Sequence, residues 1–140
     1  MSTHTPKELD LFKKFSGRFT ARIEPADGSP AKEARWELSP VLGGAGYLET
    51  FEELTPGVNN KVCILWGFDA KEKKYTRTGI NGSGEWATAD GMWNGQEFTW
   101  NVNPQLRFVL SSQGHNVLIK AESPTNKQWT VAAQIFCNRI

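Results

Sequence analysis

The sequence predicts an all-β protein, a closed antiparallel up-and-down β-barrel of about ten strands with a short N-terminal helix. Three observations predict it. Hydrophobicity alternates with period two after residue 17, turn-forming residues separate the alternating runs, and no second helical block exists to supply the crossovers of a parallel sheet. A flat sheet of this size would leave exposed edges, which closure removes. The chain of 140 residues favours a single domain over residues 1–140.

The N-terminal segment predicts the helix. Thr5 can cap it, Pro6 suits its first position, and Glu8 follows the cap by three residues. We expect the helix to end at Gly17 and to plug one end of the barrel. Its apolar stripe comprises Leu9, Phe12 and Phe15, broadened by Leu11.

The remainder of the chain predicts strands joined by tight turns. The predicted strands are residues 18–24, 33–38, 47–54, 61–69, 74–81, 85–93, 98–102, 106–111, 117–122 and 128–140. Because residues 61–69 are apolar on both faces, we expect this strand to be well covered. Asp90-Gly91 suggests a bulge or bend. Asn94-Gly95 predicts a hairpin with a type I′ turn, so Asn94 serves the backbone and not catalysis.

Composition and charge exclude several classes. The net charge is +1, so no basic excess exists to bind nucleic acid. No apolar run approaches the roughly 18 residues of a membrane span, and no secretory signal is visible, so we expect a cytoplasmic protein. Cys63 and Cys137 lie in apolar segments without a CxxC pattern, and we expect buried, reduced thiols. A disulfide would require their strands to be adjacent.

Short motifs along the chain carry a family resemblance. A helix leading into Gly17-Arg18-Phe19 is similar to the Gly-x-Trp opening of the calycins, the lipocalin and fatty-acid-binding barrels, with Phe19 in place of the tryptophan. The rest resembles more closely DUF1579, a bacterial family of uncharacterised calycin-like barrels. The motifs are Leu42-Gly43-Gly44, Gly67-Phe68-Asp69, the Tyr75 strand, Gly91, Trp93-Asn94-Gly95 and a Trp129 strand ending in Asn138-Arg139.

This resemblance spans nearly the whole chain. The family has Trp-Asp-Gly where this chain has Trp93-Asn94-Gly95, and either dipeptide suits the same turn. The resemblance implies a barrel fold. It implies no reaction and no catalytic residues.

The sequence predicts neither a metal site nor a cofactor. His4 lies near the N-terminus and His115 in a predicted turn, and no HxH, HExxH or CxxC pattern is present. Some related barrels hold haem through a histidine, but we expect His115 to face solvent. No GxSxG nucleophile motif occurs, and the glycine-rich residues 81–84 form a hairpin, not a phosphate loop.

Charged side chains leave one question open. Glu49 and Glu53 share a strand face, which we interpret as a solvated outer face or a barrel rim. If that face points inward, Glu49 is a buried ionisable group and a candidate acid or base, as Asp90 would also be if buried. An inward arginine could bind a ligand carboxylate. Alternation predicts that Arg35 and Arg107 face water, and it leaves Arg77 undecided.

The aromatic residues are the best lead to function. Six of them fall on the apolar phase of their strands, and they are the candidate ligand-binding residues: Trp36, Trp66, Trp86, Trp100, Phe108 and Trp129. We place Trp129 on one face with Val131, Ala133 and Ile135. If these faces converge, the interior is aromatic and suits a small hydrophobic ligand. Alternatively, the aromatic side chains simply fill the barrel.

Three hypotheses follow. The favoured one is a non-enzymatic barrel that binds a small hydrophobic or amphipathic molecule. The second is a small enzyme with a buried carboxylate, Glu49 or Asp90, as its base. The third is an interaction module without a ligand, in which the apolar strand at residues 62–66 forms an outer patch that favours a homodimer.

Overall fold

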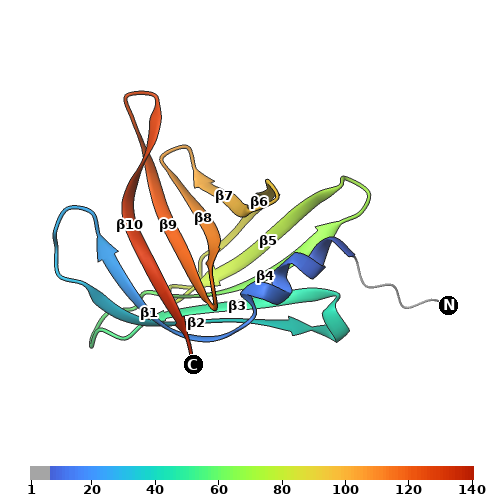
Figure 1. Ribbon diagram of the computed structural model, residues 1–140, viewed down its shortest axis with the longest axis horizontal. Helices are drawn as coiled ribbons and strands as arrows, with labels where there is room; N and C mark the ends of the chain where they lie inside the picture. Colours follow the sequence, from blue (N-terminus) through green and yellow to red (C-terminus); the bar gives the residue numbers. More distant parts are fainter. Residues whose placement is uncertain (1–6) are drawn as a thin grey trace.

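A computed structural model describes residues 7–140 and has the predicted architecture. Within that range, ten antiparallel strands form one closed barrel, preceded by a short N-terminal helix (Figure 1). Each strand pairs with the next along the chain, and pairing of β1 with β10 closes the barrel. The strands are β1 (Gly17–Pro25), β2 (Lys32–Val41), β3 (Gly46–Glu53), β4 (Lys61–Asp69), β5 (Lys74–Asn81), β6 (Trp86–Trp93), β7 (Glu97–Asn103), β8 (Leu106–Gln113), β9 (Asn116–Thr125) and β10 (Gln128–Arg139).

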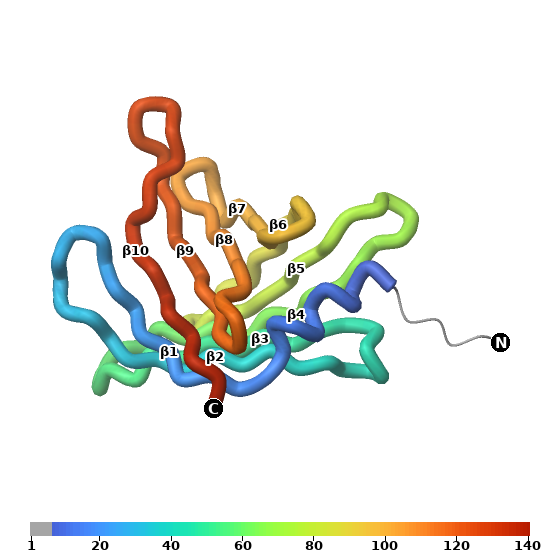
Figure 2. The backbone as a smooth tube through the Cα atoms, viewed as in Figure 1, coloured from blue at the N-terminus to red at the C-terminus, as the bar shows by residue number. Residues whose placement is uncertain are grey.

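The up-and-down order places alternate turns at opposite ends of the barrel. Figure 2 shows the chain running back and forth between these ends. The turns after β2, β4, β6 and β8 lie at the same end as the N-terminal helix, and a second short helix, η2 (Leu42–Gly44), belongs to the first of them. The turns after β1, β3, β5, β7 and β9 lie at the opposite end. No helix within residues 7–140 is long and apolar enough to cross a membrane.

The N-terminal helix closes one end of the barrel, as predicted. It is a 3₁₀ helix, η1 (Lys7–Phe15), and three residues per turn bring Leu9, Phe12 and Phe15 onto one face. All three side chains are buried. The ring centroid of Phe12 lies 5.3 Å from that of Tyr47 and 5.6 Å from that of Trp66. The predicted capping residues Thr5 and Pro6 lie outside the described residues, as does His4.

Strand register sorts the side chains into an inner and an outer face, because paired residues of antiparallel strands share a face. One inner row crosses four strands from Phe19 through Trp36 and Phe51 to Val62. Another inner row crosses three strands from Tyr47 through Trp66 to Arg77. The core therefore lies inside the barrel, and it is aromatic at the end that η1 closes.

Two irregularities of the sheet lie where the sequence did not predict them. Register shifts occur between Asn101 and Asn103 in β7 and between Val131 and Ala133 in β10. The pairs on either side of Gly91 run without a shift, so of the predicted bulge or bend, the bulge does not form there. Gly91 instead permits close packing, since a Cβ atom at this position would lie 2.1 Å from the ring of Phe98.

The hairpin between β6 and β7 forms as predicted, but its turn is not type I′. Gly95 has a φ of 100°, whereas Asn94 does not have a positive φ. The side chain of Asn94 accepts hydrogen bonds from the backbone N–H groups of Gln96 (2.8 Å) and Glu97 (2.7 Å). Consecutive positive φ values, as a type I′ turn requires, occur at Asn126 (51°) and Lys127 (66°) between β9 and β10.

The outer face of β4 is not covered, contrary to the prediction for residues 61–69. Leu65 is 51% exposed, and Cys63 is also exposed. Their inward neighbours Ile64 and Trp66 are buried. An all-apolar run cannot show by itself which of its faces meets a second layer, and no element among residues 7–140 forms a second layer outside β4.

Candidate functional site

The barrel contains a cavity of about 540 Å³ at the end opposite η1. Its walls are mainly apolar, and several of the inward side chains are small, including Gly79, Ala87, Ala121 and Ala133. Small residues on facing strands leave space that the larger core side chains do not fill. The volume is within the usual range of ligand pockets, roughly 300–1,000 Å³.

Glu49 lies at the inner end of this cavity and is 5% exposed. Its Oε2 accepts a hydrogen bond from Nε1 of Trp36, and its Oε1 accepts one from Nε1 of Trp66, each over 2.8 Å. The interpretation of a solvated outer face is therefore wrong for both Glu49 and Glu53, and the alternative of a barrel rim fits only Glu53, the last residue of β3. The register of β3 turns both inward, and the two indole N–H groups compensate the burial of the Glu49 charge.

Arg77 faces the same cavity from β5. Its Cζ lies 5.2 Å from the ring centroid of Trp66 and 4.7 Å from that of Trp100, so the guanidinium packs on two indoles. Its Nε is buried and has no hydrogen-bond partner within residues 7–140. Burial lowers the pKa of Arg77, and the negative charge of Glu49 opposes that effect. Arginine remains protonated under either influence.

Four of the six predicted aromatic residues lie inside the barrel. Trp36, Trp66 and Trp100 are buried, and Phe108 is partly buried and stacks on Trp100 with 5.5 Å between ring centroids. Trp36, Trp100 and Phe108 line the cavity directly. Trp66 binds Glu49 and packs beneath Arg77. The structure thus brings these rings together around the two charged side chains.

The other two tryptophans lie elsewhere. Trp86 is at the mouth of the cavity and is 70% exposed. Trp129 is on the outer wall, under the guanidinium of Arg107 at 4.4 Å, so its prediction as a barrel-lining residue is wrong. The bulge in β10 is the reason. It reverses the alternation, so that Trp129 and Val131 face outward while Ala133 and Ile135 face the cavity.

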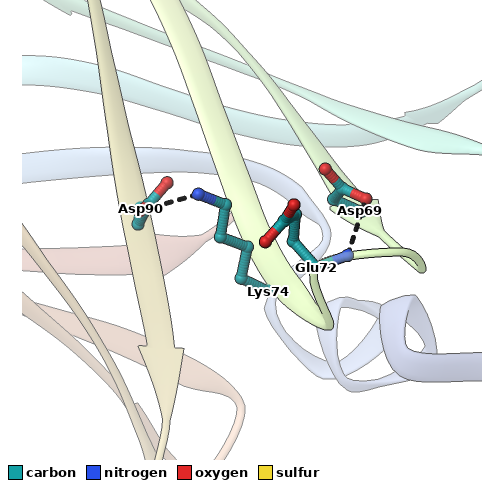
Figure 3. Close-up of polar contacts among 4 residues, drawn as sticks. All are labelled: Asp69, Glu72, Lys74 and Asp90. Atoms are coloured by element: carbon teal, nitrogen blue, oxygen red, sulfur yellow. Dashed lines mark hydrogen bonds and ion pairs between the residues drawn. The ribbon is translucent and has the colours of Figure 1, made fainter.

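Asp90 is not a candidate base. It is exposed, and its Oδ2 pairs with Nζ of Lys74 over 3.3 Å on the outer surface (Figure 3). Figure 3 also shows Asp69 accepting a hydrogen bond from the backbone of Glu72 in the β4–β5 turn. Arg35 and Arg107 face outward as predicted, and Arg107 pairs with Glu122 over 2.7 Å. Glu49 is therefore the carboxylate that the strands place within the cavity.

Two further buried groups lie near the site. Glu53 accepts a hydrogen bond from Nδ2 of Asn60 over 3.0 Å, and this bond lowers the pKa of Glu53. Cys137 is buried on β10, and burial together with the charge of Glu49 raises its pKa to about 12. The thiol therefore stays protonated and unreactive at neutral pH. The expectation of two buried thiols is confirmed for Cys137 and wrong for Cys63.

Residues 7–140 contain no group of three or more potential metal-ligating side chains. His115 is exposed in the turn between β8 and β9. A larger hollow of about 660 Å³ lies on the outer wall between β1 and β5. Exposed charged residues line it, Arg18, Arg35, Glu52 and Lys61 among them. The inner cavity is the better candidate because its polar groups are buried and held in fixed positions.

Sequence reasoning missed how the charged residues act together. Glu49 and Arg77 lie on the same inner face as Trp36 and Trp66. If the alternation of inward and outward residues is followed consistently from β2 to β5, it predicts that both charged side chains point inward. The hydrogen bonds of Glu49 could not be predicted, because they depend on the offset between neighbouring strands.

No family model matches the chain. Among curated proteins, the chain is similar to the protein transport protein SEC13 of two strains of the fungus Cryptococcus neoformans var. neoformans serotype D. Each match is 28% identical over 130 residues and covers 83% of this chain but 36% of the relative. The chain thus spans about a third of the length of these relatives. Such a match assigns neither a family nor a role, and the resemblance to DUF1579 stays a prediction.

Proposed function

We propose that the protein is a non-enzymatic binding barrel for a small amphipathic molecule, with the apolar part of the ligand in the cavity and its polar end at Glu49 and Arg77. The observation that carries the proposal is an apolar cavity with two fixed, oppositely charged side chains at its inner end. Pockets that bind small molecules combine apolar walls with a few convergent polar groups in this way.

Binding is favoured over catalysis by the environment of Glu49. Each of its oxygens already accepts an indole N–H, so the carboxylate is held in one orientation. A carboxylate held in this way suits the positioning of a ligand, whereas a general base must gain and lose a proton in every turnover. The second charged group, Arg77, has no basic function because it keeps its proton.

We place the protein in the cytoplasm. Cys63 and Cys137 are free, and their strands β4 and β10 are not neighbours in the barrel. An exposed thiol such as Cys63 is usual in a reducing compartment and uncommon in an oxidising one.

The neutral dye Nile red tests the proposal, because its fluorescence rises in apolar surroundings. We expect saturable binding of one dye per barrel. Ala121→Phe places a ring in the cavity and should weaken this binding by about tenfold or more, which is about 1.4 kcal/mol. Ala70→Phe is the control, since Ala70 is exposed in the β4–β5 turn at the opposite end. Equal binding by wild type and Ala121→Phe, or no binding at all, would contradict the proposal.

A further inference from the structure

The inner end of the cavity carries two opposite charges that do not pair with each other. Both contact the same indole, since Glu49 binds Nε1 of Trp66 and Arg77 packs on its ring. They come from β3 and β5, with β4 between them. Within residues 7–140, ion pairs involve other residues, and none joins Arg77 to Glu49. The pair therefore leaves hydrogen-bonding capacity for a third group.

That capacity includes both donors and acceptors. Arg77 lines the cavity and its guanidinium donates no hydrogen bond within residues 7–140; its Nε and the Nε1 of Trp100 are unpaired as well but are buried out of reach of the cavity. Glu49 uses one hydrogen bond on each oxygen, while a carboxylate offers about four lone-pair sites. Unmet polar capacity in a buried place is costly. A ligand that accepts from the Arg77 side and donates to Glu49 would relieve that cost.

The charge balance distinguishes among possible ligands. An anionic head group would be attracted by Arg77 and repelled by Glu49. A cationic head group would be attracted by Glu49 and repelled by Arg77. Each would also lose its own hydration on entering a site of low dielectric. A neutral head group loses less hydration and gains from both residues. Glu85, a further charged residue lining the cavity, is exposed at the mouth and hydrogen-bonded by Asn81, where water screens it.

We infer that the ligand carries a neutral head group of the carboxamide type, with a C=O acceptor beside an N–H donor, on an apolar tail. The C=O accepts from the Arg77 side of the inner end, and the N–H donates to Glu49. The tail extends along the small inward residues toward the mouth at Trp86. This inference rests on the proposed function and specifies the chemistry of the ligand.

The inference is tested with four ligands that share a ten-carbon chain and differ in the head group: decanamide, methyl decanoate, decanoate and decylamine. Each competes with Nile red at a concentration below its micellar concentration. We expect decanamide to bind the wild type most tightly, by about tenfold over decanoate and decylamine, or about 1.4 kcal/mol. Methyl decanoate, which accepts but does not donate, should fall between. All arms are at neutral pH, where decanoate is anionic and decylamine cationic.

Two variants should change the preference in opposite directions. Arg77→Met leaves Glu49 unopposed and should shift the preference toward decylamine. Glu49→Gln leaves Arg77 unopposed and should shift it toward decanoate. The matched controls are Arg35→Met and Glu52→Gln, because these two residues are cross-strand partners on the outer face of β2 and β3. The order of the four affinities should be unchanged in both controls.

The outcomes separate the inference from the proposed function. If decanoate binds the wild type most tightly, or if all four ligands bind equally, the inference is overturned while a binding barrel remains supported. If Arg77→Met, which removes no hydrogen bond seen in the structure, keeps the wild-type order, the role of the charge pair is overturned. If Nile red binds but none of the four displaces it, the inference is overturned while a binding barrel remains supported; if Nile red itself does not bind, the proposed function fails.

Discussion

The guanidinium of Arg139 lies over the ring of Phe19, with its Cζ 4.6 Å from the ring centroid. These residues are cross-strand partners at the seam where the last strand meets the first. The same guanidinium donates hydrogen bonds to the backbone carbonyls of Lys14 (3.2 Å), Ser16 and His115 (2.9 Å). One side chain therefore ties the end of η1, the closing strands and the β8–β9 turn together.

Replacement of Arg139 should loosen this seam. Arg139→Ala removes the stacking and the three carbonyl contacts, and we expect the free energy of unfolding to fall by about 1–2 kcal/mol. Arg139→Lys should not restore it, because an ammonium lacks the planar fork that reaches several carbonyls. Urea unfolding followed by tryptophan fluorescence measures the change. Arg18→Ala, an exposed neighbour on β1, is the control, and equal losses in both variants would refute the prediction.

Removal of the Glu49 side chain should cost more. Glu49→Ala leaves the indole N–H groups of Trp36 and Trp66 buried without acceptors, so we expect a loss of about 2–4 kcal/mol in the free energy of unfolding. Glu52→Ala, at the exposed position three residues along β3, should change stability by less than about 0.5 kcal/mol. Chemical denaturation of both variants checks the difference. A stable Glu49→Ala protein would mean that water replaces the carboxylate.

Gly91 should not tolerate a methyl group. Its inward Cβ position lies 2.1 Å from the ring of Phe98 and 3.1 Å from that of Trp66, so Gly91→Ala forces rings at the core to move. Overpacking of this kind costs about 1–3 kcal/mol. Gly67→Ala is the matched control, because the added Cβ atom would lie no closer than 3.4 Å to any neighbour, the nearest being the hydroxyl oxygen of Thr76. Thermal unfolding that shows the two variants to be equally stable would contradict this account.

The two thiols should differ in reactivity. Cys63 is exposed on β4, whereas Cys137 is buried with a pKa of about 12. A disulfide reagent at neutral pH should therefore modify one thiol per folded chain and two in denaturant. Cys63→Ser should abolish the reaction of the folded protein. Rapid modification of the folded Cys63→Ser variant would show that β10 opens readily.

Stability should decrease at alkaline pH. The ordinary pKa of the Cys137 thiol is 9.0, and in the folded protein it is about 12. Between these values the unfolded chain loses the proton while the folded protein keeps it, so the free energy of unfolding falls as pH rises. Burial also raises the pKa of Tyr47 and Tyr75, which act in the same direction. Cys137→Ala should therefore show a shallower decline in urea midpoints above about pH 9; an unchanged slope would exclude the thiol.

The architecture could be predicted because it depends on local and repeated features. Alternation marks each strand, the helix ends at Phe15 just before Gly17 begins β1, and edges left open would be unfavourable, so ten antiparallel strands close. The spacing of Leu9, Phe12 and Phe15 also agrees with the 3₁₀ helix that forms, although three-residue spacing alone does not separate it from an α-helix.

The site was less predictable because it depends on relations between strands. A glutamate usually faces water. Glu49 can be buried inside the barrel because the register of β2 and β4 against β3 brings two indole N–H groups to its carboxylate. Alternation alone puts Trp129 on the same face as Ala133 and Ile135, whereas the bulge in β10 places it on the opposite face. Neither the offset nor the bulge leaves a clear mark in the local sequence.

The alternation of turns between the two ends of the barrel has a consequence for how the proposed binding site could vary in sequence. The five hairpin loops at the open end surround the entrance, whereas Glu49, Arg77 and their indoles are held by strand interiors and by η1 from below. Lengthening a loop such as residues 54–60 would change the shape of the cavity mouth without moving Glu49 or Arg77. Under the proposed function, changes in these loops would alter which ligands can enter the cavity without altering the residues proposed to contact the head group.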